Sequence, residues 1–177
     1  MLAVRVAGVA DAAAVARIYN EGIEERRSTF ETTPRTVEDI LAWLRAGDRL
    51  PVLVADQGGG PLGWGRILRY SDRAAYTGVG EASVYVQRAA RGQGIGRRLL
   101  EELEGRALEL GYWKLTAKVF PENAGSVALV RRCGWREVGL HLRHGQLEGV
   151  WRDVLVVERL IDAEAPAPDG GAASLDG

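Results

Sequence analysis

The chain has 177 residues, of which 46% are hydrophobic and 27% charged, and its formal net charge is −1. These values predict one soluble globular domain with a core of its own, and they give no reason to expect nucleic acid or an anionic membrane surface as a partner. No apolar run approaches the ~18–20 residues of a membrane span, and no signal peptide precedes the first expected strand. Cys133 is the single cysteine, which excludes an internal disulfide and is compatible with a cytoplasmic location.

Hydrophobic spacing predicts two helices and three strands in the first part of the chain. Asp11 is placed to cap a helix through about Arg26, because apolar residues recur on one face of that segment. Thr36 and Asp39 resemble a capping box for a second, shorter helix. A Gly-Gly-Gly-Pro turn makes the second and third strands an antiparallel pair. The three strands are expected over residues 4–6, 51–55 and 62–68.

The second part of the chain predicts a longer alternation of strands and helices. A strand from Glu81 to Val86 leads through a glycine-rich turn into a helix that ends near Leu110, where Gly111 follows. The later elements are expected as a strand over 115–120, a helix over 123–132, and strands over 135–142 and 151–160. This order is typical of an α/β domain with a mixed sheet, formed by residues 1–161. Residues 162–177 are rich in Ala, Pro, Gly and Asp and are expected to be a disordered tail.

The segment over residues 84–100 carries the strongest functional signal. A strand ends, a basic glycine-rich turn follows and a helix begins, so backbone N–H groups and a helix N-terminus point to one place where a phosphate would sit. Gly92, Gly94 and Gly96 allow the backbone to approach such a ligand. Two other phosphate-binding patterns do not fit. A dinucleotide-binding fingerprint would need glycine where Arg97 stands, and a Walker loop would need Gly-Lys-Ser/Thr, which the segment lacks. The remaining alternative is a glycine-rich turn without a ligand.

The pattern Arg91-x-x-Gly94-x-Gly96, after a strand and before a helix, resembles the acetyl-CoA loop of the GCN5-related N-acetyltransferase (GNAT) family. The resemblance extends from residue 4 to about residue 160 and implies a mixed central sheet flanked by helices, with acetyl-CoA as co-substrate. Asn123 matches the family's asparagine that contacts the pantetheine arm, and its alternative role is a plain helix N-cap. The resemblance places the coenzyme against Val84, Tyr85, Val86, Arg91, Gly92, Gln93, Gly94, Ile95, Gly96 and Arg97.

Acetyl transfer to an amine requires a base for the amine, stabilisation of an oxyanion and departure of a thiolate. Alternation along the strand before the turn puts Glu81, Ser83 and Tyr85 on one face. A carboxylate that has lost part of its hydration is a better base near neutral pH, so we interpret Glu81 as the general base, acting directly or through a water. The alternatives are a solvated strand edge or a pair with an arginine. The resemblance implies that the backbone N–H of Val86 polarises the thioester carbonyl.

One position departs from the family pattern. Many members carry a tyrosine in the last helix that protonates the leaving thiolate, and relatives that acetylate phosphinothricin carry a histidine there. This chain has Val130, which cannot donate a proton. Either Tyr85 takes that role or the thiolate leaves unassisted and takes its proton from solvent.

The chain also resembles the phosphinothricin, methionine sulfoximine and arsinothricin N-acetyltransferases, which acetylate the α-amine of glutamate-like toxins. Such substrates carry polar or anionic groups at both ends, and the arginine fork suits these groups. Arg73 and Tyr76 are therefore expected to hold them, with Phe30 beside the methylenes and Glu81 and Ser83 facing the substrate. The alternatives are a solvated loop charge for Arg73 and a core position for Phe30. The resemblance rests on residues 18–23, 28–32, 73–76, 81–86 and 149–154.

The remaining residues carry weaker signals. His141 and His144 are assigned to a strand and a surface turn, Cys133 to a small buried site, and Trp135 and Trp151 to the core or a subunit interface. No residues have metal-ligand spacing, so a metal is not expected. The resembling enzymes are usually dimers, which implies a homodimer. Two other functions stay open: an acetyltransferase for a protein N-terminus or another amine, and a non-catalytic acetyl-CoA sensor.

Overall fold

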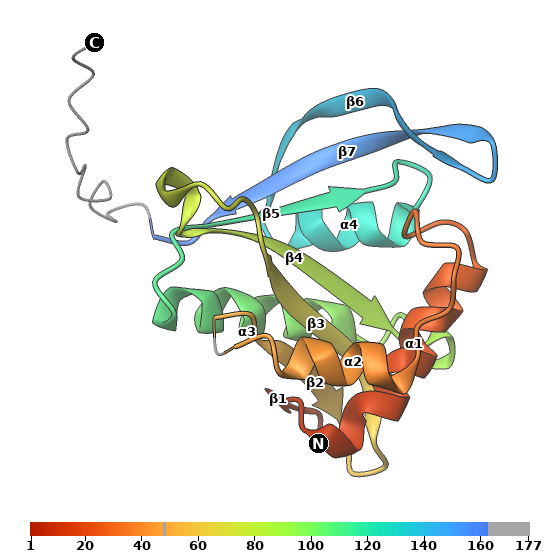
Figure 1. The fold of residues 1–177 in the computed structure, drawn as a ribbon, viewed down its shortest axis with the longest axis vertical. Helices are drawn as coiled ribbons and strands as arrows, with labels where there is room; N and C mark the ends of the chain where they lie inside the picture. Colours follow the sequence, from red (N-terminus) through yellow and green to blue (C-terminus); the bar gives the residue numbers. More distant parts are fainter. Residues whose placement is uncertain (48, 163–177) are drawn as a thin grey trace.

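The computed structural model describes residues 1–47 and 49–162 (Figure 1). The predicted tail lies outside the described residues, apart from Asp162. The helices are α1 (Ala12–Glu24), α2 (Val37–Leu44), α3 (Ile95–Glu109) and α4 (Ala124–Arg132). The strands are β1 (Ala3–Val6), β2 (Val52–Asp56), β3 (Pro61–Arg69), β4 (Val79–Val86), β5 (Lys114–Val119), β6 (Arg136–Leu147) and β7 (Val150–Leu160). They form a seven-stranded sheet in the order β1-β2-β3-β4-β5-β7-β6, which confirms the predicted α/β class and the mixed sheet.

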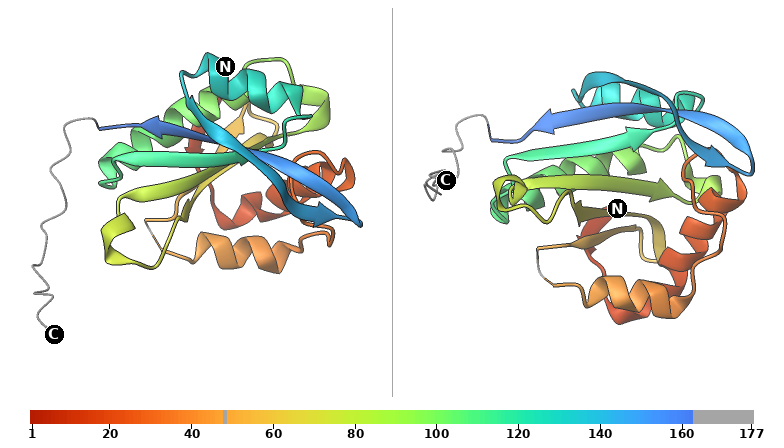
Figure 2. Two further views of the ribbon diagram at one scale, coloured as in Figure 1. Left: turned by 90° about the horizontal axis from the view of Figure 1, so that it is seen from above. Right: turned by 45° about the horizontal axis from the view of Figure 1, so that its top comes forward.

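The sheet lies between two layers of helices (Figure 2). α1 and α2 cover one face, while α3 and α4 cover the other. Ile95, Leu99 and Leu103 of α3 are at most 1% exposed, as the spacing predicted, and pack in the core cluster of the α3–α4 side. On the other face, Ile18 and Ile23 of α1 pack in a separate cluster that includes Trp64. Each helix pair therefore buries an apolar face against its own side of the sheet.

The pairing of β4 with β5 stops halfway along the two strands. These strands are parallel, and only Val79–Lys114, Gly80–Leu115 and Glu81–Thr116 lie opposite each other. Beyond that point β4 remains paired with β3 as far as Val86, and β5 remains paired with β7 as far as Val119. Figure 1 shows the two arrows diverging. The strands are thus held apart by their outer neighbours, and the facing edges form no ladder with each other.

Local capping explains where the first helices begin, with one correction. The Thr36–Asp39 capping box is present, since Thr36 N donates to Asp39 Oδ2 at 2.8 Å and Asp39 N donates to Thr36 Oγ1 at 3.2 Å. Asp11 is the N-cap residue of α1, as expected, but its side chain makes no capping hydrogen bond to this helix. Its carboxylate accepts hydrogen bonds from Arg5 at 2.7 and 2.9 Å and from Gly8 N at 2.8 Å. The bond from Arg5 is the main reason that the pKa of Asp11 lies below its ordinary value.

Tertiary pairing extends some elements beyond their predicted limits. β4 begins at Val79 rather than Glu81, because Val79 pairs with β5 and Gly80 pairs with both β3 and β5. β6 continues to Leu147, five residues past its expected end, because the hairpin with β7 closes at the Leu147–Val150 pair. The expected loop over 69–79 contains a short 3-10 helix, Ala74–Tyr76. Within residues 1–47 and 49–162, no helix is long and apolar enough to cross a membrane.

Candidate active site

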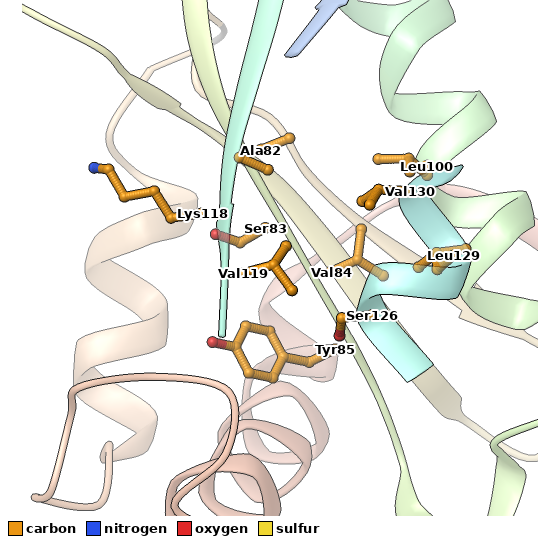
Figure 3. Close-up of a pocket in the computed structure, with 11 residues that line it drawn as sticks. Ala82, Ser83, Val84, Tyr85, Leu100, Lys118, Val119, Ser126, Leu129 and Val130 are labelled. Carbon is orange, nitrogen blue, oxygen red and sulfur yellow. The ribbon is translucent and has the colours of Figure 1, made fainter. Parts of the chain in front are cut away.

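A cavity occupies the place where β4 and β5 separate, and we call it the β4–β5 slot (Figure 3). Ala82 and Val84 line it from the α3–α4 side of β4, whereas Ser83 and Tyr85 belong to the opposite face by strand alternation. The slot therefore reaches both faces of the sheet. The backbone N–H and C=O groups along its edges can form hydrogen bonds with an extended ligand that carries amides, as they would with an additional β-strand. Its other lining residues are Leu100, Ala117, Lys118, Val119, Ser126, Leu129 and Val130.

The glycine-rich turn follows β4 at one end of the slot. Gly92 and Gly94 have φ of 78° and 80°, a left-handed conformation that favours glycine, and a Cβ at either position would meet no atom within 4 Å. Gly94 is the N-cap of α3. In the described part of the chain, the backbone N–H groups of residues 92–97 donate no hydrogen bond to a protein acceptor. Six donors beside a helix N-terminus are therefore free for an acceptor from outside the chain, and their binding of an anion stays a prediction.

Glycine is needed at position 96 for helix packing and not for the conformation of the turn. A Cβ there would lie 3.2 Å from Leu129 Cδ2, which is tighter than an ordinary contact. The absent side chain therefore lets the start of α3 approach α4, beside the slot that Leu129 lines. Only Gly92 and Gly94 serve the bend of the turn itself.

Ion pairs connect the start of the glycine-rich turn to the C-terminal end of α1. Arg88 Nε and Arg91 Nη1 lie 2.7 and 2.9 Å from the carboxylate of Glu25. Burial by itself would raise the pKa of Glu25, but the hydrogen bonds from Arg91 and Arg88 outweigh it and lower that pKa. Arg97 pairs with Glu101 one turn along α3, at 2.7 Å. Sequence reasoning assigned Arg91 to the coenzyme and missed Glu25, which has no recognisable local motif.

The predicted row of polar side chains on β4 is confirmed, and it faces the α1–α2 layer. The β3–β4 register sets Leu68 opposite Glu81, Arg66 opposite Ser83, and Trp64 opposite Tyr85. Glu81 pairs with Lys118 of β5 at 2.8 Å, and its side chain is 25% exposed. The partner is a lysine rather than the arginine considered as an alternative. The ion pair fixes the position of the Glu81 carboxylate next to Lys118, which lines the slot.

Tyr85 is held in an aromatic cluster. Its ring stacks on Trp64 at 4.9 Å between centroids and meets Tyr19 edge-on at 4.8 Å. Its hydroxyl donates to the carbonyl of Ser28 at 3.3 Å. Burial is the main cause that raises the pKa of Tyr85 well above its ordinary value. The hydroxyl is therefore suited to donating a hydrogen bond and poorly suited to giving up its proton, and Val130 in α4 offers no replacement.

Phe30 and Asn123 lie beside the slot with structural contacts of their own. Phe30 meets Phe120 edge-on at 4.8 Å, and a Cβ on Gly145 would lie 2.8 Å from its ring, so it joins the α1–α2 loop to β6. Phe30 is 37% exposed, which excludes a fully buried core position. Asn123 is the N-cap of α4, with Oδ1 accepting from Ser126 N at 3.2 Å. Asn123 therefore acts as a helix N-cap, and its contact with the coenzyme stays a prediction.

The structure does not bring Arg73 and Tyr76 to the slot. Arg73 lines a second hollow, which also contains Arg49 and Arg69 and shares no lining residue with the slot. Tyr76 is 40% exposed and packs edge-on against Tyr70 at 5.6 Å. Sequence reasoning missed Lys118, which lines the slot, and Arg66, which lies in β3 opposite the lining residue Ser83. The sequence feature that could have identified Arg66 is a charged residue inside an otherwise apolar strand.

Other residues with weaker signals lie away from the slot. His141 and His144 are both in β6, exposed, with their Nδ1 atoms 3.1 Å apart. Trp135 is 4% exposed and donates to Glu104 at 2.8 Å, which confirms a core position, whereas Trp151 is 54% exposed. Burial raises the pKa of the Cys133 thiol, which fits its interpretation as an unreactive residue. The described residues contain no group of three or more metal-ligating side chains.

Comparisons with known proteins agree with this geometry. An L-methionine sulfoximine/L-methionine sulfone acetyltransferase of Pseudomonas paraeruginosa is 33% identical over 168 residues, which cover 93% of this chain and 98% of that protein. A phosphinothricin acetyltransferase of Sinorhizobium meliloti, solved with acetyl-CoA, has a TM-score of 0.87 at 30% identity and covers 96% of this chain and 94% of its own. A ribosomal-protein-alanine N-acetyltransferase of Brucella melitensis has a TM-score of 0.85 at 35% identity, covering 89% and 99%.

The model of the acetyltransferase (GNAT) family matches residues 15–135, which include most of α1, the whole of β4, the glycine-rich turn and α4. The diverging strands, the free amides of the turn and the relatives all agree with this match. The chain therefore belongs to the GNAT family of acetyltransferases.

Proposed function

We propose that this acetyltransferase moves the acetyl group of acetyl-CoA to the α-amine of a glutamate-like amino acid and thereby detoxifies it. The acceptors would belong to the class of phosphinothricin, methionine sulfoximine and arsinothricin. The observation that carries the proposal is the β4–β5 slot, which has the six free amides of the turn after the end of β4 and is lined by Lys118, the ion-pair partner of Glu81. The acceptor class is supported by the names of the relatives. We place the reaction in the cytoplasm, where acetyl-CoA is supplied.

The donor would occupy the α3–α4 side of the slot. The amides of residues 92–97 would bind the pyrophosphate, together with the helix N-terminus. The facing edges of β4 and β5 would hold the pantetheine arm as an additional strand, with Asn123 near its path. The coenzyme supplies an activated acyl group. The N–H of Val86, at the end of β4, would stabilise the developing oxyanion.

The acceptor would approach from the α1–α2 side. Glu81, held beside Lys118, would remove a proton from the substrate ammonium, directly or through a water, so that the amine can attack the thioester carbon. Ser83 and Phe30 would border the acceptor. Tyr85 would keep its proton, so solvent would accept the second proton of the attacking nitrogen and supply one to the leaving thiolate. Positioning of the two reactants in one slot would supply much of the remaining rate.

A panel of amines assayed with acetyl-CoA by release of the free thiol tests this function. The panel contains phosphinothricin, methionine sulfoximine and arsinothricin, together with peptides that begin with alanine. We expect kcat/KM for at least one glutamate analogue to exceed that for the peptides by about 100-fold. Faster peptide acetylation would instead support a protein N-terminal acetyltransferase. Acetyl-CoA binding without turnover of any amine would support the sensor.

We also propose that a second copy of the chain covers the outer part of β6 and β7. β6 is an edge strand of the sheet, and both strands expose large apolar side chains there. These residues are Val138, Leu140, Leu142, Val150 and Trp151, each 47% exposed or more.

Light scattering should give twice the chain mass of 19.2 kDa. Leu142→Arg should reduce it to one chain, because it would bury an unpaired charge at the contact. The matched control is Val6→Arg on β1, the opposite edge strand, where Val6 is 57% exposed. A wild-type monomer, or dissociation by both variants, would contradict this assembly.

A further inference from the structure

Arg66 is a half-buried cation without a counter-ion. It lies in β3 between Gly65 and Ile67, both of which are buried. Its guanidinium carbon is 3.6 Å from the centroid of the Trp43 ring. Its Nε is buried and has no hydrogen-bond partner. Across residues 1–47 and 49–162, no carboxylate oxygen comes within 4.0 Å of its guanidinium nitrogens, although most arginines of the chain have such a partner.

The neighbours of Arg66 do not neutralise it. Burial is the main cause that lowers the pKa of Arg66, but arginine remains charged near neutral pH even so. The charges and hydroxyls that act on it belong to Tyr19, Tyr85, Arg35 and Glu31. The carboxylate of Glu31 already pairs with Arg35 at 2.6 Å. A cation removed from water without a partner destabilises the fold, so the site favours an anion supplied from outside the chain.

The stacking on Trp43 decides which part of Arg66 can receive that anion. Contact with the ring uses one face of the guanidinium. The N–H donors lie in the plane of the guanidinium and point away from its faces. Stacking on the ring therefore does not engage them. Two of them can bind a carboxylate in the paired geometry that guanidinium and carboxylate share. The ring therefore fixes the orientation of the fork without occupying it.

The strand register places this fork on the acceptor side of the slot. Arg66 lies opposite Ser83, which lines the slot, and the next pairs on the same face of the sheet contain Glu81 in one direction and Tyr85 in the other. All of these side chains are on the α1–α2 face by alternation. An anion held by Arg66 would thus lie next to the position from which an amine reaches the slot. In an amino acid, the anionic group next to the α-amine is the α-carboxylate.

We propose that Arg66 binds the α-carboxylate of the acceptor and so selects free amino acids over amines that lack this group. The proposal rests on the proposed function, since it assumes an amino-acid acceptor. It assigns to Arg66 a role that the sequence resemblance had placed on Arg73.

The test compares an accepted amino acid with its α-carboxamide, which keeps the amine and side chain but loses the anion. The wild type should prefer the free acid by about 100-fold in kcat/KM. Arg66→Met should raise KM for the acid until this preference disappears, while leaving KM for the carboxamide nearly unchanged. Arg66→Lys should retain part of the preference, because lysine keeps the charge and loses the paired geometry. The matched control, Arg73→Met, removes an arginine of the second hollow and should keep the full preference.

Two further measurements separate the possible failures. Calorimetry with acetyl-CoA should give the same affinity for Arg66→Met and wild type, and its melting temperature should not fall, because the variant removes an unpaired buried charge. If the wild type acetylates amino acids but accepts the carboxamide equally well, or if Arg66→Met keeps the preference, the role of Arg66 is wrong while the proposed function stands. If the wild type binds acetyl-CoA and acetylates no amino acid, both fail. Should Arg66→Met not fold, the wild-type preference and Arg66→Lys still decide.

Discussion

Replacing Glu81 with glutamine is expected to lower kcat by about 1,000-fold, in the range typical for loss of a general base. Glutamine has nearly the same shape, and its carbonyl oxygen can still accept from Lys118, but it cannot take a proton from the substrate ammonium. The affinity for acetyl-CoA, measured by calorimetry, should stay at the wild-type value. The reason is that Glu81 lies on the α1–α2 face, whereas the free amides lie beyond the other end of β4.

The control for this prediction is Lys118→Met, which breaks the same ion pair and leaves the carboxylate in place. Exposed pairs of this kind contribute little to stability, so the variant should stay folded. Because the carboxylate that takes the proton is still present, kcat should change by no more than about 10-fold. If both variants lost activity equally, the pair would act as a structural unit and not as a base with its partner. A wild-type rate for Glu81→Gln would show that another group or solvent accepts the proton.

Replacing Gly94 with aspartate is expected to weaken acetyl-CoA binding by about 1,000-fold, as measured by calorimetry. A carboxylate at this N-cap would accept hydrogen bonds from the first N–H groups of α3, which are the donors assigned to the pyrophosphate. Its negative charge would also repel the phosphates at close range. The fold should survive, because no protein atom lies within 4 Å of a Cβ at Gly94.

Gly111→Asp is the matched control for that variant. Gly111 follows the other end of α3 and has a φ of 78°, close to the 80° of Gly94, with no atom within 4 Å of its Cβ position. Both variants impose the same backbone strain, but the aspartate at residue 94 also caps α3 while that at residue 111 meets the negative end of the helix dipole, so Gly111→Asp should lower the melting temperature at least as much as Gly94→Asp. Only Gly94→Asp should lose acetyl-CoA affinity. Equal losses of affinity would mean that strain in α3, and not the donors of the turn, is responsible.

Features that depend on neighbours in the sequence were predictable from the sequence. The order of strand, basic turn and helix around residues 84–100 follows from β-branched residues, then glycines, then an apolar stripe. The Thr36–Asp39 capping box and the inward face of α3 are likewise set by residues three or four positions apart. The row of Glu81, Ser83 and Tyr85 follows from strand alternation alone. Backbone geometry couples such residues directly, so no tertiary contact is needed to place them.

Features that depend on pairing between distant segments were decided only by the tertiary structure. The slot exists because β3 and β7 hold β4 and β5 apart beyond Glu81, and nothing within either strand marks the place where pairing stops. The carboxylate of the N-cap residue Asp11 binds Arg5 of β1, and not the first N–H groups of α1.

The arginines show the same division most clearly. Alternation along β3 could place Arg66 on a face, but not show that Glu31 is taken by Arg35 or that Trp43 of α2 lies against its guanidinium. Arg73 fitted the substrate pattern by sequence, yet the path of the loop after β3 puts it in a separate hollow. The charge of a side chain is a property of its own residue. Whether that charge meets a partner depends on segments dozens of residues away, and only their packing determines it.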